Sequence, residues 1–273
     1  MTAVTETSSP RIRTDVRDAV GTVEISNPAR RNALSVAMMT ELAAALRAMD
    51  EDPEVRVVVV RGAGEQAFVS GADISEFPGR QDEAARQAAD DAATTLFTQL
   101  SALSVPVIAR IHGYCLGAGM ALALGADLRY ADTRSVLAIP AARLGVGYPL
   151  AQTAALVQTV GPSVASDLLF TGRRLPAAEA HAVGLVDRVV EPDELGKVVD
   201  ELAATIAANA PLSVRAAKAS VQAVRRLSEG DEAAGSAALG HAIQAVARCR
   251  TSDDLREGAL AFLEKRPPRF TGR

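Results

Sequence analysis

The stretch of residues 105–127 constrains the fold more than any other part of the chain. It begins with the apolar run Val105–Ile111, which is rich in β-branched residues and is typical of a buried strand. Glycines then indicate a turn at positions 113, 117 and 119, and Met120–Leu124 are helix formers. The stretch therefore predicts a strand, a glycine-rich turn and a helix whose first backbone N–H groups are available to an anionic oxygen.

These glycines have a second interpretation, which is a tight packing corner between a strand and a helix. The better-known phosphate loops do not fit the stretch. No Gly-Lys-Ser or Gly-Lys-Thr ending is present, and no G-x-G-x-x-G follows the strand. At this point both a packing corner and a site for an anionic oxygen remain open.

Composition excludes some classes of protein. With 48% hydrophobic and 23% charged residues, the 273-residue chain is predicted to be globular, as one large domain or two small ones. The net charge of −4 argues against a nucleic acid as partner, although a basic cluster could still hold one phosphorylated small molecule.

The chain carries no sign of export, of a membrane span or of a metal site. Residues 1–10 are polar and lack the features of a signal peptide, and no apolar run reaches about 18 residues. Cys115 and Cys249 are far apart and follow no metal-ligand spacing. We therefore expect a cytoplasmic protein without metal and without membrane contact.

Segment types change along the chain. Residues 1–10 are expected to be disordered, and residues 12–26 to form a hairpin. The run Val57–Val60 indicates a strand that helices cover on both faces. Strands and helices alternate up to residue 190, after which only helices follow, near 193–208, 212–228, 231–247 and 252–264. This order predicts an α/β core over 11–190 and a helical C-terminal region over 191–273.

Several short motifs follow one another along most of the chain. They include Asn32-Ala-Leu34, Phe68–Ile74, His112–Gly119, Leu144-Gly145, Thr171-Gly172, Ala210-Pro211 and Phe262–Arg266. Together they resemble the crotonase family, also called the enoyl-CoA hydratase/isomerase family, from about residue 12 onward. The resemblance implies a crotonase-like α/β spiral of ββα units and a coenzyme A thioester as ligand. It implies no cofactor apart from that coenzyme A, and homotrimers or dimers of trimers built through residues 191–273.

The same resemblance implies a site. The backbone N–H groups of Ala72 and Ala118 would hold the thioester carbonyl in an oxyanion hole. Substrate contacts would come from Ser70, Asp73, Ile74, Gly117, Arg30, Phe262 and Lys265, with Arg31 as the alternative to Arg30. Solvated surface charge explains the two arginines equally well, and Asp73 could instead cap a turn.

The chain departs from the family at the two glutamates that its hydratases use. The corresponding positions are Ala121 and Ala141. Alanine can neither deliver a proton nor activate water, and general acid–base help contributes roughly 10²–10⁴-fold per group. We therefore expect an enoyl-CoA hydratase-like enzyme that stabilises a thioester enolate, but not hydration by the two-glutamate route.

Two alternatives follow from that loss. Tyr148 resembles the loop tyrosine of methylmalonyl-CoA decarboxylase, a relative that carries a histidine where Ala72 stands. Decarboxylation needs no glutamate, because CO₂ leaves without taking a proton, but Tyr148 also fits a packing role. The other alternative is a non-catalytic acyl-CoA binding protein. His112 is expected to be a structural hydrogen-bonding residue, and Cys115 an inert buried thiol.

Overall fold

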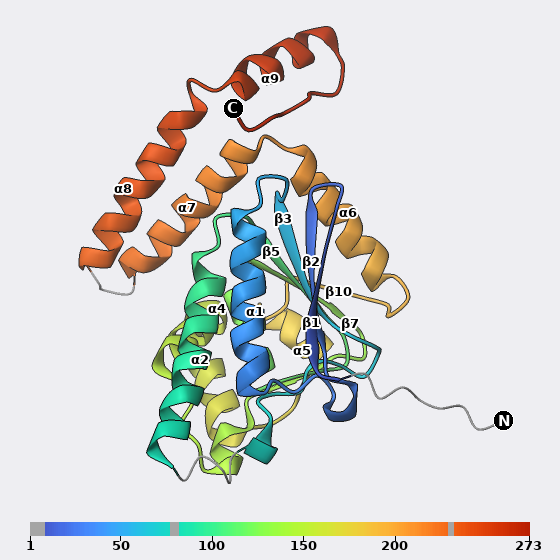
Figure 1. Ribbon diagram of the computed structural model, residues 1–273, viewed down its shortest axis with the longest axis vertical. Coiled ribbons are helices and arrows are strands. Elements are labelled where there is room, and N and C mark those ends of the chain that lie inside the picture. The colour runs from blue at the N-terminus through green and yellow to red at the C-terminus, as the bar shows by residue number, and fades with distance from the viewer. Residues whose placement is uncertain (1–8, 77–81, 229–231) are drawn as a thin grey trace, which may run out of the picture.

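Figure 1 shows the computed structural model of the chain, which describes residues 9–76, 82–228 and 232–273. The disorder expected for residues 1–10 falls almost wholly outside these ranges. Within them, two sheets and the helices around them form the core.

The larger sheet has six strands in the order β1-β2-β3-β5-β7-β10. Only β1 and β2 are antiparallel, and the other neighbours run parallel. The strands span Arg11–Arg17, Val20–Ser26, Val57–Gly62, Val107–Ile111, Leu128–Asp132 and Arg188–Val190. The expected hairpin is confirmed, and its loop residues Asp18 and Ala19 both have positive φ, as the tight turns that suit strand twist require.

The smaller sheet has four strands in the order β4-β6-β8-β9. They span Ala67–Val69, Tyr114–Leu116, Val136–Ala138 and Leu175–Pro176. Each of the strand pairs β3/β4, β5/β6 and β7/β8 gives one strand to each sheet and is followed by helix, which is the expected repetition of ββα units. Strand β6 corrects our prediction of a continuous turn after residue 112. Its three residues are held by pairing with β4 and β8, which local sequence does not reveal.

Helices cover both faces of the larger sheet, and β3 shows how. Val58 and Val60 pack with α1 (Val36–Glu51) and α2 (Glu83–Ala102), whereas Val57 and Val59 pack with α6 (Leu195–Ala208). Ser35 caps α1 as predicted, accepting a hydrogen bond from the Met38 backbone. The remaining core helices are α3 (Ala118–Gly125), α4 (Leu150–Thr171) and α5 (Ala177–Ala182).

The last three helices are α7 (Pro211–Ser228), α8 (Glu232–Cys249) and α9 (Asp253–Glu264), as the sequence predicts. In Figure 1, α7 and α8 lie side by side as an antiparallel pair, with α9 beyond them. Buried Lys218 anchors α7 to both ends of the stretch 105–127. Its Nζ donates to the Val105 carbonyl and to the Asp127 carboxylate, each at 2.7 Å.

Candidate active site

Two glycine-marked turns meet at the start of α3. One follows β4 and contains Gly71, with φ +122°, and the other follows β6 and contains Gly117, with φ +51°. A Cβ placed on Gly117 would lie 3.9 Å from the Cα of Gly71, and one on Gly119 would overlap the carbonyl oxygen of Val69. The contact therefore requires a residue without a side chain at Gly119, whereas Gly71 and Gly117 suit their positions because each has a positive φ.

The backbone of Ala72 is oriented by its pairing with Leu34. The Leu34 N–H donates to the Gly71 carbonyl at 2.9 Å, and the Asp73 N–H donates to the Leu34 carbonyl at 2.8 Å. Because successive N–H groups of an extended segment alternate in direction, the N–H of Ala72 points away from Leu34. This is the side on which β4 pairs with β6, the strand that leads into Gly117.

Ala118 is the first residue of α3, so its N–H has no acceptor within the helix. Within the described ranges, neither the N–H of Ala118 nor that of Ala72 donates a hydrogen bond to protein. Two backbone donors from adjoining turns are therefore available to a ligand oxygen.

A cavity of about 420 Å³ begins one helical turn beyond Ala118, between α2, α3, α4 and the adjoining ends of α7 and α8. Ala121, one helical turn beyond Ala118, lines it together with Phe97 and Leu124. Ala141 lies in the short helix η4 (Pro140–Leu144) and packs against the main core. The two positions where hydratases of the family carry glutamates thus hold only methyl groups.

Two buried polar atoms near this cavity have no hydrogen-bond partner among the described residues, Tyr148 Oη and Gln152 Oε1. Burial, and then the neighbouring Cys115, raise the pKa of the Tyr148 phenol above its ordinary value. Burial likewise raises the pKa of the Cys115 thiol, whose predicted burial is confirmed. We did not predict Gln152, which lines the cavity, because a glutamine in the first turn of a helix is ordinarily exposed.

The residues expected to bind coenzyme A around the first turn mostly bind one another. Asp73 Oδ1 accepts from the Ser75 backbone N–H at 3.0 Å, from Ser75 Oγ at 2.7 Å and from Arg30 Nη1 at 2.7 Å. Burial raises the pKa of Asp73, but the hydrogen bonds from Ser75 and the charge of Arg30 outweigh it and hold the pKa below its usual value. Ser70 Oγ donates to the Arg30 carbonyl at 3.0 Å. The turn-capping interpretation of Asp73 is therefore the observed one.

The other residues that we expected to contact the substrate lie outside this hydrogen-bonded group. Ile74 is 62% exposed beside the same turn. The Arg31 guanidinium lies 5.6 Å from the Tyr114 ring, and Arg174, which we did not predict, lies 5.9 Å from it. In Figure 1, α9, which carries Phe262 and is followed by Lys265, lies at the opposite end of the molecule from the N-terminal end of α2. A single chain does not bring them to the two donors.

Two absences hold for the described residues. No group of at least three His, Cys, Asp or Glu side chains there is arranged to hold a metal ion. Nor is any helix among them long and apolar enough to cross a membrane.

Known proteins are similar to this chain over almost its whole length. The family model described as Enoyl-CoA hydratase/isomerase matches residues 15–273. A short-chain-enoyl-CoA hydratase of Clostridium acetobutylicum is 34% identical over 247 residues, covering 90% of this chain and 92% of its own. A carnitinyl-CoA dehydratase of Proteus mirabilis is 34% identical over 272 residues, covering 97% and 100%.

A solved structure agrees with these sequence matches. The enoyl-CoA hydratase/carnithine racemase from Magnetospirillum magneticum superposes with a TM-score of 0.88 at 34% identity, covering 97% of each chain. The repeated ββα units and the agreement of family model, relatives and structure lead to one conclusion. The chain belongs to the enoyl-CoA hydratase/isomerase family, a family of enzymes, and has the crotonase fold.

Proposed function

We propose that the chain acts on an acyl-CoA thioester whose carbonyl oxygen is bound by the N–H groups of Ala72 and Ala118. The observation that carries the proposal is the contact between the turns at Gly71 and Gly117, with both neighbouring N–H groups free of protein acceptors. The names of the relatives, an enoyl-CoA hydratase and a carnitinyl-CoA dehydratase, support a coenzyme A thioester as substrate.

The chemistry of this site is stabilisation of an enolate. When a bond at the α-carbon breaks, negative charge moves onto the thioester oxygen, and two preorganised donors bind that oxygen more strongly as its charge grows. Each such donor typically lowers the barrier by about 2.7–4 kcal/mol. The acyl group extends into the 420 Å³ cavity that Ala121 lines.

A second candidate reaction, decarboxylation, is favoured by Tyr148. In such a reaction the bond between the α-carbon and the carboxylate breaks, CO₂ leaves, and its bonding electrons form the enolate. The enolate then takes a proton from water, so no protein carboxylate is needed. The unpartnered, buried Oη of Tyr148 supports this candidate, because it is a donor for the carboxylate of such a substrate.

The resemblance also supports a homotrimer or a dimer of trimers. Phe262 is 83% and Leu263 77% exposed on α9, which leaves apolar surface for another subunit. In such an assembly Phe262 and Lys265 contact coenzyme A bound to a neighbouring subunit. Analytical ultracentrifugation of the full chain tests the assembly, and a monomer would contradict it. The unpaired Cys115 and Cys249 support the proposed cytoplasmic location.

The decisive experiment is a mass-spectrometric screen of the purified protein against crotonyl-CoA, longer enoyl-CoA and malonyl-type thioesters. It scores both binding and product. Loss of CO₂ identifies the decarboxylase, and gain of water identifies a hydratase that uses other groups. Binding without any product would leave the non-catalytic acyl-CoA binding protein, and absence of binding would remove the whole proposal.

A further inference from the structure

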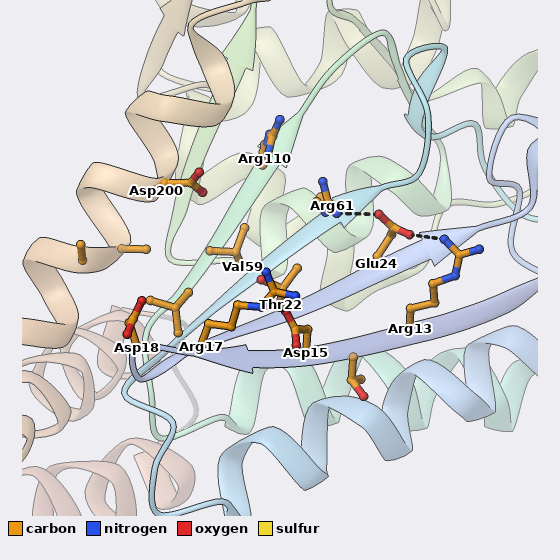
Figure 2. Close-up of a pocket in the computed structure, with 14 residues that line it drawn as sticks. Arg13, Asp15, Arg17, Asp18, Thr22, Glu24, Val59, Arg61, Arg110 and Asp200 are labelled. Carbon is orange, nitrogen blue, oxygen red and sulfur yellow. Dashed lines mark hydrogen bonds and ion pairs between the residues drawn. The ribbon is translucent and has the colours of Figure 1, made fainter.

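A row of charged side chains crosses the larger sheet on the face that α6 covers. Strand register places Arg13 opposite Glu24, Glu24 opposite Arg61, and Arg61 opposite Arg110. Residues opposite each other in a sheet project to the same face, so the four side chains form one line over four strands. Figure 2 shows this line, with Arg110 and Asp200 of α6 at its far end.

The charges in this row do not balance. Glu24 binds Arg13 through one carboxylate oxygen at 2.9 Å and Arg61 through the other at 2.7 Å. The guanidinium of Arg110 makes no hydrogen bond, and no ion pair within 4.0 Å, with any residue that the structure describes. Its nearest electrostatic partners are Arg61, which repels it, and Asp200, which attracts it from a distance. Like charges opposite each other on neighbouring strands destabilise a sheet.

Three residues that line a single cavity of about 160 Å³ beside this row carry side-chain nitrogens without a hydrogen-bond partner in the described part of the chain. These nitrogens are those of the Arg110 guanidinium, the buried Nε of Arg61 and the buried Nε2 of His112. His112 was expected to be a structural hydrogen-bonding residue, but its Nε2 has no partner in the described part of the protein. The cavity has room for roughly five waters, taking about 30 Å³ as the share of each in the liquid.

The acidic groups at this cavity are partly neutralised already. Asp132 accepts a hydrogen bond from Ser135 Oγ at 2.7 Å and lies 3.9 Å from Arg134. Glu65 is the other carboxylate in the lining. Three arginines, Arg61, Arg110 and Arg134, and His112 therefore outnumber the two carboxylates of this lining.

We propose that this cavity binds a small oxyanion of the phosphate class. Guanidinium groups suit such ligands, since their planar forks donate two hydrogen bonds to neighbouring oxygens. A second cavity of about 720 Å³ shares Arg61 and Arg110 with it and continues over Val20, Val59 and Ala203. Its rim is charged, with the arginines Arg13 and Arg17 and the carboxylates of Asp15, Asp18, Glu24 and Asp200. This continuation suits the organic part of a phosphorylated small molecule. The site lies on the opposite face of the larger sheet from α3 and does not depend on the proposed function.

Titration calorimetry of the full chain with inorganic phosphate tests the site. The wild-type protein is expected to bind, and Arg110→Gln to weaken binding by about tenfold or more, because a charge-assisted hydrogen bond is lost. Arg47→Gln is the matched control. Arg47 is exposed on α1, against the other face of the sheet, and its loss removes the same charge. Absence of phosphate binding, or an equal loss in both variants, overturns the proposal.

Binding of adenosine 5′-monophosphate tests whether the natural ligand is a phosphorylated small molecule or free phosphate. Tighter binding than inorganic phosphate assigns a phosphorylated small molecule, and equal binding assigns free phosphate. The melting temperature gives a second readout, since a ligand that binds only the folded state raises it. Phosphate is expected to raise it for wild type and Arg47→Gln but not for Arg110→Gln. The proposal is overturned if phosphate still raises the melting temperature of Arg110→Gln.

Discussion

The cavity beside α3 and the cavity beside Arg110 lie on opposite faces of the larger sheet, and each adjoins donors that lack protein partners. Beside α3 the donors are backbone N–H groups, at Ala72 and Ala118, which carry only partial charge. Beside Arg110 they are side-chain nitrogens, two of which belong to guanidinium groups with a permanent charge, although the Arg61 guanidinium also pairs with Glu24. Partial charges suit an oxygen whose charge develops during a reaction, whereas permanent charges suit a ligand that is already an anion. In the two proposals, this contrast distinguishes a site for chemistry from a site for binding.

The largest expected effect comes from restoring carboxylates beside α3. Ala121→Glu combined with Ala141→Glu is expected to raise hydration of crotonyl-CoA, by roughly 10²–10⁴-fold for each working group. Absorbance at the enoyl thioester band measures the rate. Ala142→Glu, which adds one carboxylate at an exposed neighbouring position, is the control. If the double variant binds crotonyl-CoA yet hydrates it no faster than wild type, the cavity is not the acyl site.

The second-largest effect is expected from removing one of the two backbone N–H donors. Ala118→Pro deletes the N–H at the first position of α3, where proline is well tolerated. We expect turnover of the substrate found in the screen to fall by roughly 10²–10³-fold. Ala118→Gly keeps the N–H and should retain most activity. Equal rates for the proline and glycine variants would show that this amide does not bind the reacting oxygen.

Tyr148→Phe separates the two candidate reactions. It removes a buried hydroxyl without a partner, so the free energy of unfolding should rise, by about 1–3 kcal/mol at most. If the enzyme is a decarboxylase, CO₂ release should fall while substrate binding is retained. Chemical denaturation measures the first effect and an isotope-release assay the second. A variant that is stabilised and equally active would leave Tyr148 as a packing residue.

The smallest effect is expected on the charged face. In the absence of phosphate, Arg110→Gln removes the repulsion with Arg61 and should stabilise the protein by about 0.2–1 kcal/mol. Arg47→Gln should leave the unfolding free energy nearly unchanged. Urea denaturation in chloride buffer measures both. A loss of stability in Arg110→Gln would mean that Arg110 is held by interactions of the protein alone.

Local sequence predicted the elements better than their pairing. The hairpin over 11–26, the Ser35 cap and the four C-terminal helices follow from turn chemistry and helical periodicity. Strand β6 was missed, because three residues between glycines carry no periodicity and pair only with distant strands. The predicted boundary at residues 190–191 assigns α6 to the C-terminal region, although α6 packs on the larger sheet.

The sequence by itself predicted the two glycine-marked turns, since glycine spacing and apolar runs are local properties of the chain. Its motifs also indicated the family, and the spiral of ββα units was predicted from that resemblance alone. The absence of carboxylates at Ala121 and Ala141 was also visible there. Only the tertiary structure decided three other features. Arg30 forms an ion pair with Asp73, and Tyr148 Oη and Gln152 Oε1 are buried without partners among the described residues. Arg61 and Arg110 lie opposite each other on neighbouring strands. These facts depend on strand register and burial, which bring together residues far apart along the chain.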